Sequence, residues 1–282
     1  MSLPWNMAGV ICPHRAMLIA QITDLHILPP GRLAFGRVDT AACLARAVAR
    51  LGTLDPRPDV VVATGDLVDA GGAEEYAHLR RLLAPLELPL YVLPGNHDSR
   101  PALAEAFRDH AYLPQGCEFL HYTVEDWPLR LIALDTIEPP EAGGRLCEQR
   151  RAWLEARLAE QPHRPTLLMT HHPPFATGIA HMDEMGLAAP EALAEMIRRY
   201  GNVVRVISGH VHRPIQAPFA GTTASTGPST AHQVMLDLTA DGEARYTLEP
   251  PGFQLHLWRP EAGLVTHTAV VDDFPGPYLF RD

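Results

Sequence analysis

Six short apolar runs, separated by segments with helical periodicity, constrain the fold of this chain more than any other feature. The runs occupy residues 17–24, 59–66, 88–96, 130–136, 165–172 and 202–210. Between them, apolar residues recur on one face of segments 39–51, 74–84, 148–160 and 190–200, which predicts amphipathic helices. Apolar strands that alternate with such helices are typical of sheets buried on both faces. We therefore expect an α/β fold over about the first 215 residues.

Polar side chains follow five of these six runs at the point where each predicted strand ends. They are Asp24 and His26, Asp66, Asn96 and His97, His171 and His172, and His210 and His212. Ligand sites in α/β sheets form at the carboxyl ends of the strands. We therefore expect these side chains to converge in space, although they are far apart in the sequence.

The residue types in these clusters are typical of metal ligands. Imidazole nitrogens and carboxylate oxygens together suit Zn, Mn and Fe. In Asp24-x-His26 and His210-x-His212, residues two apart share one side of an extended segment. Gly65, Gly95 and Gly209 each precede a cluster and allow the backbone to turn sharply.

A structural interpretation explains each cluster when it is taken alone. A single histidine after a strand is usually a packed or surface residue, and an isolated Gly-Asn or Gly-Asp pair is usually a turn. Five strand ends would then have to carry metal-ligand side chains by coincidence. The joint pattern favours a metal site.

The motifs, in this order, resemble those of the calcineurin-like metallophosphoesterases. They are DLH (24–26), GD (65–66), GNHD (95–98), HHPP (171–174) and GHVH (209–212). The chain is most similar to the bacterial class III cyclic-nucleotide phosphodiesterases and the related glycerophosphodiesterase, since the STAHQV segment (229–234) and the FPGPYLF ending also look like that branch. The resemblance implies a four-layer αββα sandwich, in which two mixed β-sheets are flanked by helices and a dinuclear metal site lies at the strand carboxyl ends.

The resemblance also implies a ligand set and two divalent metal ions (Fe, Mn or Zn). The first ion is assigned Asp24, His26, Asp66 and His212. The second is assigned Asp66, Asn96, His171 and His210, with Asp66 bridging. Substrate contacts are assigned to Asn96, His97 and His232. The branch places a Tyr at the position that Phe35 occupies here, so a hydrogen bond from that hydroxyl is not expected.

The expected reaction is hydrolysis of a small phosphodiester, a 3′,5′-cyclic nucleotide or a glycerophosphodiester. Two metals would lower the pKa of a water molecule, and the resulting metal-bound hydroxide would attack phosphorus. Asp66 and His97 are the predicted catalytic residues. His97 either protonates the leaving alkoxide or orients a neighbouring group. Because neighbouring residues on an extended segment point in opposite directions, His172 is expected to support the loop rather than bind metal.

Other functions remain compatible with the same fold. They are a phosphomonoesterase, a protein phosphatase and a catalytically inactive metal-binding scaffold. A nuclease acting on a nucleic-acid polymer is disfavoured, because the formal net charge is −10 and binding to a phosphate backbone needs a basic face.

Three segments are expected along the chain. They are a loose N-terminal leader (1–16), a catalytic domain (17–235) and a C-terminal strand-rich segment (236–282) that acts as a cap or an oligomer contact. Residues 244–250, 253–260 and 264–271 within or near the last segment have the character of strands. No apolar run is long enough to span a membrane, so we expect a cytoplasmic protein without a membrane partner, assembled as a homo-oligomer.

Overall fold

A computed structural model describes residues 15–281 of the chain. One sheet has five strands in the order β16-β15-β1-β2-β3. Their bounds are β1 (Met17–Ile22), β2 (Val60–Thr64), β3 (Leu90–Leu93), β15 (Gly252–Arg259) and β16 (Gly263–Val270). β1, β2 and β3 are parallel, whereas β15 runs antiparallel to both β1 and β16.

The second large sheet has six strands in the order β11-β12-β10-β8-β5-β4. Their bounds are β4 (Tyr122–Val124), β5 (Arg130–Ala133), β8 (Thr166–Met169), β10 (Val203–Ser208), β11 (Ile215–Phe219) and β12 (Thr222–Thr226). The four central strands are parallel, and the two edge strands are antiparallel to their neighbours.

Two small sheets lie beside the large ones. One contains β6 (Ile137–Glu138), β7 (Glu141–Arg145) and β9 (Leu187–Ala188). The other pairs β13 (Gln233–Val234) with β14 (Tyr246–Thr247).

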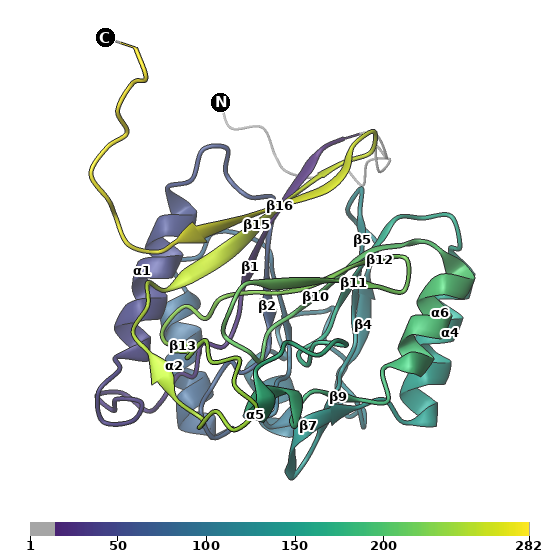
Figure 1. Cartoon of the computed structure of the whole chain (residues 1–282), viewed down its shortest axis with the longest axis horizontal. Coiled ribbons are helices and arrows are strands. Elements are labelled where there is room, and N and C mark those ends of the chain that lie inside the picture. Colours follow the sequence, from purple (N-terminus) through teal and green to yellow (C-terminus); the bar gives the residue numbers. More distant parts are fainter. Residues whose placement is uncertain (1–14, 282) are drawn as a thin grey trace.

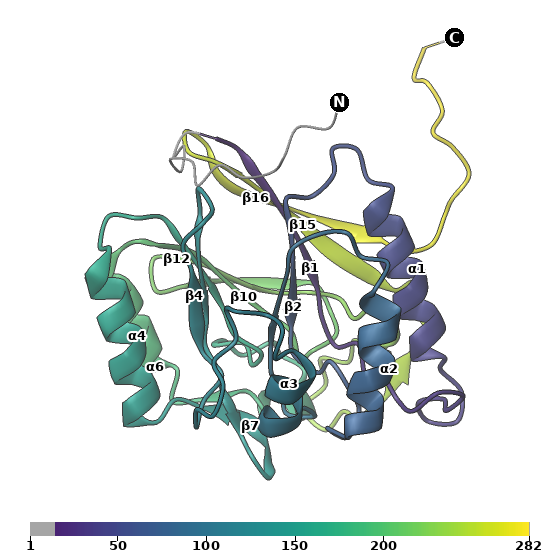
Figure 2. The ribbon, with the colours of Figure 1, turned by 180° about the vertical axis from the view of Figure 1, so that it is seen from behind.

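Among the six helices of the described residues, the four longest cover the outer faces of the two large sheets (Figures 1 and 2). The bounds of the six are α1 (Thr40–Gly52), α2 (Ala73–Leu83), α3 (Arg100–Ala106), α4 (Glu148–Glu160), α5 (Ala180–Asp183) and α6 (Glu191–Tyr200). The four predicted helices are confirmed to within one residue at each end, and α3 and α5 were not predicted. Asp39 caps α1, because its side chain accepts a hydrogen bond from the main-chain N–H of Ala42 at 2.9 Å.

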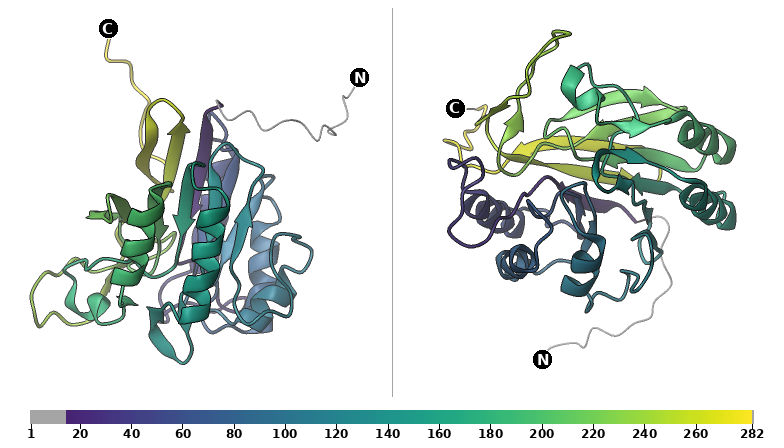
Figure 3. Two further views of the ribbon diagram at one scale, coloured as in Figure 1. Left: turned by 90° about the vertical axis from the view of Figure 1, so that its right-hand side faces the viewer. Right: turned by 90° about the horizontal axis from the view of Figure 1, so that it is seen from below.

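Alternation along the central strands explains how the layers pack. Leu167 and Met169 of β8 belong to the core between the two sheets, whereas Leu168 packs in the core beneath α4 and α6. Successive side chains of a strand point to opposite faces, so each central strand is buried on both sides. The result is the predicted four-layer αββα arrangement, which Figure 3 shows from two further directions.

The C-terminal part of the chain extends the first sheet. β15 pairs with β1 along Met17–Gln21, and the hairpin to β16 turns at the predicted Glu261–Gly263 segment. The strand expected over 244–250 is only two residues long. The proposed boundary at residue 236 stays a prediction, and residues 1–14 of the proposed leader lie outside the described residues. Within 15–281, no helix is long and apolar enough to cross a membrane.

Candidate metal centre

The polar side chains that follow the strands meet where the two large sheets face each other. They come from the segments after β1, β2 and β3 of one sheet and after β8 and β10 of the other. Because these five strands present their carboxyl ends at the same end of the sandwich, side chains from distant parts of the sequence become neighbours.

One group of side chains contains Asp24, His26, Asp66 and His212. All four are buried, and one ligand atom from each lies within 4.8 Å of the others. The Nε2 atoms of His26 and His212 are 3.1 Å apart. His26 Nε2 is 3.6 Å from Asp66 Oδ2, and His212 Nε2 is 3.5 Å from Asp24 Oδ1. These are the four residues predicted to hold the first ion.

A second group adjoins the first through Asp66. Asn96 Oδ1 lies 3.0 Å from His171 Nε2 and 3.1 Å from His210 Nδ1. Asp66 Oδ2 lies 3.4 Å from His171 Nε2 as well as 3.6 Å from His26 Nε2. One oxygen atom of Asp66 therefore faces both groups, which is the position that a shared ligand requires.

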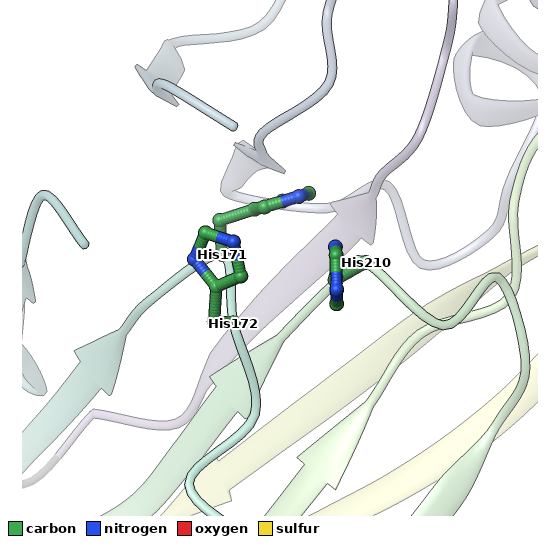
Figure 4. Close-up of side chains that lie close together, drawn as sticks. All are labelled: His171, His172 and His210. Atoms are coloured by element: carbon green, nitrogen blue, oxygen red, sulfur yellow. The ribbon is translucent and has the colours of Figure 1, made fainter. Parts of the chain in front are cut away.

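His172 lies beside His171 and His210 (Figure 4), but both of its ring nitrogens have other partners. Nδ1 is 2.8 Å from Thr136 Oγ1, and Nε2 is 2.9 Å from the carbonyl oxygen of Ala142. A ligand nitrogen needs a free lone pair, so this geometry disfavours His172 as a ligand.

The backbone is strained at five of the candidate ligands. The φ angles are 52° at Asp24, 43° at His26, 49° at Asp66, 73° at His210 and 51° at His212. Residues other than glycine adopt this left-handed region rarely, and such strain gathers at functional sites. The local conformation therefore directs these side chains inward at an energetic cost.

Gly95 makes the close approach of the segments possible. A Cβ atom at this position would collide with the main-chain nitrogen and side-chain Oδ1 of Asp66. The same loop donates a hydrogen bond from the His97 main-chain N–H to Asp66 Oδ1 at 2.9 Å. The loop after β3 is thus fixed against the residue that joins the two groups.

The electrostatics of the centre fit divalent cations. Asp24 and Asp66 are 0% and 2% exposed, and among the described residues the basic side chains within 4.0 Å of their carboxylates are histidines, with no permanently charged arginine. Buried carboxylates are costly unless a positive charge compensates them. His210 Nε2 is buried with no hydrogen-bond partner. A pair of divalent ions would satisfy this donor set, and imidazole with carboxylate suits Fe, Mn and Zn.

The histidine pKa values differ with their surroundings. Burial lowers the pKa of His212 to about 3 despite the nearby Asp24 carboxylate. Burial also acts to lower the pKa of His171, but the carboxylates of Asp66 and Asp24 and the hydrogen bond to the Thr64 carbonyl together outweigh it and raise the value to about 9. The Asp66 carboxylate is therefore the largest of the contributions that raise the pKa of His171 at the junction of the two groups.

His97 and His232 lie beside the first group. The exposed His97 ring packs edge-on against His26, with centroids 4.6 Å apart, and its Nδ1 lies 2.7 Å from the carbonyl oxygen of Asp69. The buried His232 ring is 4.8 Å from His212 and 5.5 Å from His26. All the residues predicted for the site are therefore brought together.

Sequence reasoning missed two residues at this centre. Asp69 Oδ1 lies 3.3 Å from His26 Nδ1, and the only signal for it was its place three residues after Asp66. The ring of Tyr246 stacks on Phe35 at 4.5 Å and lies 5.6 Å from His232. No pattern in the sequence connects Tyr246 with residues more than two hundred positions earlier.

The fold and its centre define a class of metal-dependent phosphoesterases. A solved dimetal phosphatase from Danio rerio superimposes with a TM-score of 0.61 at 16% identity, covering 91% of this chain and 99% of that one. This likeness concerns the fold alone. Residues 17–214 match the family model described as calcineurin-like phosphoesterase, and the chain belongs to that family.

Two relatives resemble the chain over nearly its whole length. A probable glycerophosphodiester phosphodiesterase of Arcobacter nitrofigilis is 38% identical over 94% of this chain and 97% of its own. A 3′,5′-cyclic adenosine monophosphate phosphodiesterase of Pseudomonas aeruginosa is 29% identical over 92% and 91%. The family and fold predicted from the motifs are confirmed, and these relatives are hydrolases of phosphodiester bonds, as predicted for this chain.

Proposed function

We propose that this protein is a metal-dependent phosphodiesterase that hydrolyses small phosphodiesters, either 3′,5′-cyclic nucleotides or glycerophosphodiesters. The observation that carries the proposal is the position of Asp66 Oδ2 between two groups of ligand atoms, 3.6 Å from His26 and 3.4 Å from His171. The names of the two relatives support the choice of substrate class.

Seven residues would hold two divalent ions in this proposal. They are Asp24, His26, Asp66, Asn96, His171, His210 and His212. When bound, such ions offset the charge of a phosphoryl group and acidify water. Iron, manganese and zinc are the candidate metals, because all three accept mixed imidazole and carboxylate ligands.

His97 is assigned the role of general acid. Its Nδ1 lies 2.7 Å from the Asp69 carbonyl oxygen, which can only accept, so Nδ1 carries a proton and donates it in this hydrogen bond. When the ring is doubly protonated, Nε2 carries the second proton and is the nitrogen that can deliver it to the departing alcohol. The ring is exposed beside His26, so a substrate at the first group of ligands is within its reach.

His232, next to the same group, is assigned to substrate binding. His232 Nδ1 is buried without a hydrogen-bond partner, and burial lowers the pKa of this ring to about 4. The ring is therefore neutral near pH 7. Phe35, 65% exposed, packs edge-on against His232 and stacks on Tyr246, so an apolar wall lies next to the unsatisfied nitrogen. This combination suits the alcohol part of a small diester.

A second copy of this chain is the proposed protein partner. β16 is the edge strand of the first sheet and contains no charged residue over its eight positions. Unprotected edge strands of this kind pair readily with another strand. Val265 is 44% exposed on this strand, and the segment beyond it includes the exposed Phe274 and Tyr278. The proposed dimer joins two β16 edges.

Analytical ultracentrifugation tests the dimer. The native chain is expected to sediment as a dimer or a larger assembly. Val265→Lys, which adds a charge to the edge strand of each copy, is expected to weaken the assembly. A native monomer at micromolar concentration would contradict the proposal.

Hydrolysis of a substrate panel by the Mn²⁺-loaded protein tests the proposed activity. The panel contains 3′,5′-cyclic AMP, 2′,3′-cyclic AMP, glycerophosphocholine and glycerophosphoethanolamine, together with bis(4-nitrophenyl) phosphate and 4-nitrophenyl phosphate. Faster turnover of diesters than of the monoester is expected. Preference for the monoester would identify a phosphomonoesterase, and bound metal without turnover would identify an inactive scaffold. The cytoplasmic location stays a prediction.

A further inference from the structure

In three of the candidate ligand histidines, the ring nitrogen that faces away from the centre, called here the outer nitrogen, has one of two kinds of partner. His171 Nδ1 lies 2.9 Å from the carbonyl oxygen of Thr64, and His212 Nδ1 lies 3.0 Å from that of His232. A main-chain carbonyl only accepts hydrogen bonds, so each Nδ1 carries the proton. In the neutral form that metal binding requires, each ring then has the lone pair of Nε2 facing the centre.

His26 has a side chain as its outer partner instead. Its Nδ1 lies 3.3 Å from Asp69 Oδ1, and its Nε2 faces His212 and Asp66. In the part of the chain that the structure describes, His26 is the one predicted ligand whose outer nitrogen is paired with a carboxylate. This contact can be removed by a substitution, whereas the two carbonyl contacts cannot.

The main chain around Asp69 is fixed on both sides. Its N–H donates to the carbonyl oxygen of Ile27 at 3.2 Å, one residue beyond His26. Its own carbonyl oxygen accepts the Nδ1–H of His97 at 2.7 Å. Val68, its neighbour, is fully buried and forms a β-bridge with Ile27. The carboxylate therefore has a defined place between His26 and the His97 loop.

We propose that Asp69 is a positioning residue of the first metal site, whose carboxylate fixes the tautomer and orientation of His26. The inference rests on the proposed metal centre and goes beyond it, because Asp69 is not among the predicted ligands. A carboxylate partner raises the basicity of a ligating histidine and holds its ring, and losing such a partner typically costs about 10- to 100-fold in metal affinity.

A competing interpretation makes Asp69 a ligand itself. Ligand atoms of His26, Asp69 and His97 lie within 4.8 Å of one another. An ion there would require the imidazole nitrogens facing Asp69 to give up their present partners, including the 2.7 Å contact from His97 to the Asp69 carbonyl. The two interpretations differ in metal stoichiometry, which makes them separable.

Titration of the metal-free full-length protein with Zn²⁺, in competition with a chelator, tests the inference. The variants are Asp69→Ala, Asp69→Asn and Asp126→Ala, the last an exposed aspartate on the turn between β4 and β5. In Asp69→Ala we expect two ions still to bind, one of them about 10- to 100-fold more weakly and the other unchanged. Asp69→Asn should lose less metal affinity, because its amide oxygen can still accept a hydrogen bond from His26. Asp126→Ala should match the native protein.

A spectroscopic readout separates positioning from general loss of structure. In the Zn²⁺-loaded native protein, long-range ¹H–¹⁵N spectra should contain a protected Nδ1–H signal from His26. Asp69→Ala should lose this signal while those of His171 and His212 remain.

Four results would overturn the inference. Native affinity for both ions in Asp69→Ala would remove any role for Asp69, and equal weakening of both would indicate a general structural effect. If Asp69→Ala bound one ion fewer than the native protein and bound the remaining ions with native affinity, Asp69 would be a ligand. A retained His26 signal would refute the tautomer assignment. Failure of the native protein to bind Zn²⁺ would instead reject the proposed function.

Discussion

Seven candidate ligands form the floor of the site, and four ring-bearing side chains form its rim. The floor consists of Asp24, His26, Asp66, Asn96, His171, His210 and His212. The rim consists of Phe35, His97, His232 and Tyr246. Polar atoms of the floor lie 3.0–3.6 Å apart. By contrast, the ring centroids of Phe35, His232 and Tyr246 are 4.5–5.6 Å from one another, and His97 packs on His26 of the floor.

The difference shows what each region is built to do. Floor residues follow buried strands directly, and five of them occupy a strained backbone conformation, so their geometry is fixed by both sheets. Rim residues come from loops and from the two-residue strand β14, and three of them, Phe35, His232 and Tyr246, pack ring against ring. Substitutions in the rim can therefore alter substrate preference without dismantling the floor.

Removal of Asp66 is expected to have the largest effect on the floor. Asp66→Ala deletes the one carboxylate that faces both ligand groups, so both ions and all measurable diesterase activity should be lost. Elemental analysis of the purified variant checks this. Two metals per chain in the variant would contradict the shared position of Asp66.

Removal of His97 is expected to have the next largest effect, and it depends on the leaving group. An alkoxide leaving group, with a pKa of about 15, needs a proton far more than 4-nitrophenolate, with a pKa of about 7. His97→Ala should lower kcat for an alkyl diester by roughly 10²- to 10⁴-fold. It should have little effect on bis(4-nitrophenyl) phosphate. Equal losses on both substrates, with metal content intact, would leave His97 with an orienting role only.

Removal of Asn96 is expected to affect only one half of the floor. Its Oδ1 contacts His171 and His210 and faces the second ligand group. Asn96→Ala should lower the affinity for the second ion by more than about tenfold and leave the affinity for the first ion unchanged. Metal titration of the variant should then give one tight and one weak event. Parallel weakening of both ions would show that Asn96 serves the two halves together.

Removal of His232 is expected to have the smallest effect of the four. If His232 Nδ1 binds substrate with one hydrogen bond worth about 1 kcal/mol, His232→Ala should raise KM or lower kcat for diesters about fivefold. Metal content should stay at two per chain. Kinetics identical to those of the native enzyme would place this histidine outside the substrate pocket.

The floor could be predicted from the sequence because each of its residues is marked by a pattern in the neighbouring residues. Each ligand lies at or just beyond the end of an apolar run, and parallel strands bring such ends together. The four longer helices were predictable for the same reason. By contrast, α3 has only seven residues, too few to give a clear apolar periodicity, and the contact between Asp69 and His26 depends on how two loops dock.

The rim and the sheet edges depend on contacts between distant segments. Arg100 forms an ion pair with the fully buried Asp135 at 2.6 Å, although the sequence offers no reason to pair them. Tyr246 reaches Phe35 only because the chain returns to this end of the sandwich after the second sheet is complete. The pairing of β15 with β1 likewise joins the two ends of the chain. No local pattern contains this information.

Anomalous diffraction at the zinc absorption edge, on crystals of Zn²⁺-loaded protein, tests the central claim most directly. Two peaks are expected on either side of Asp66. One should lie among Asp24, His26 and His212, and the other among Asn96, His171 and His210. A single peak, or a peak bound by His172, would contradict a dinuclear centre that shares Asp66.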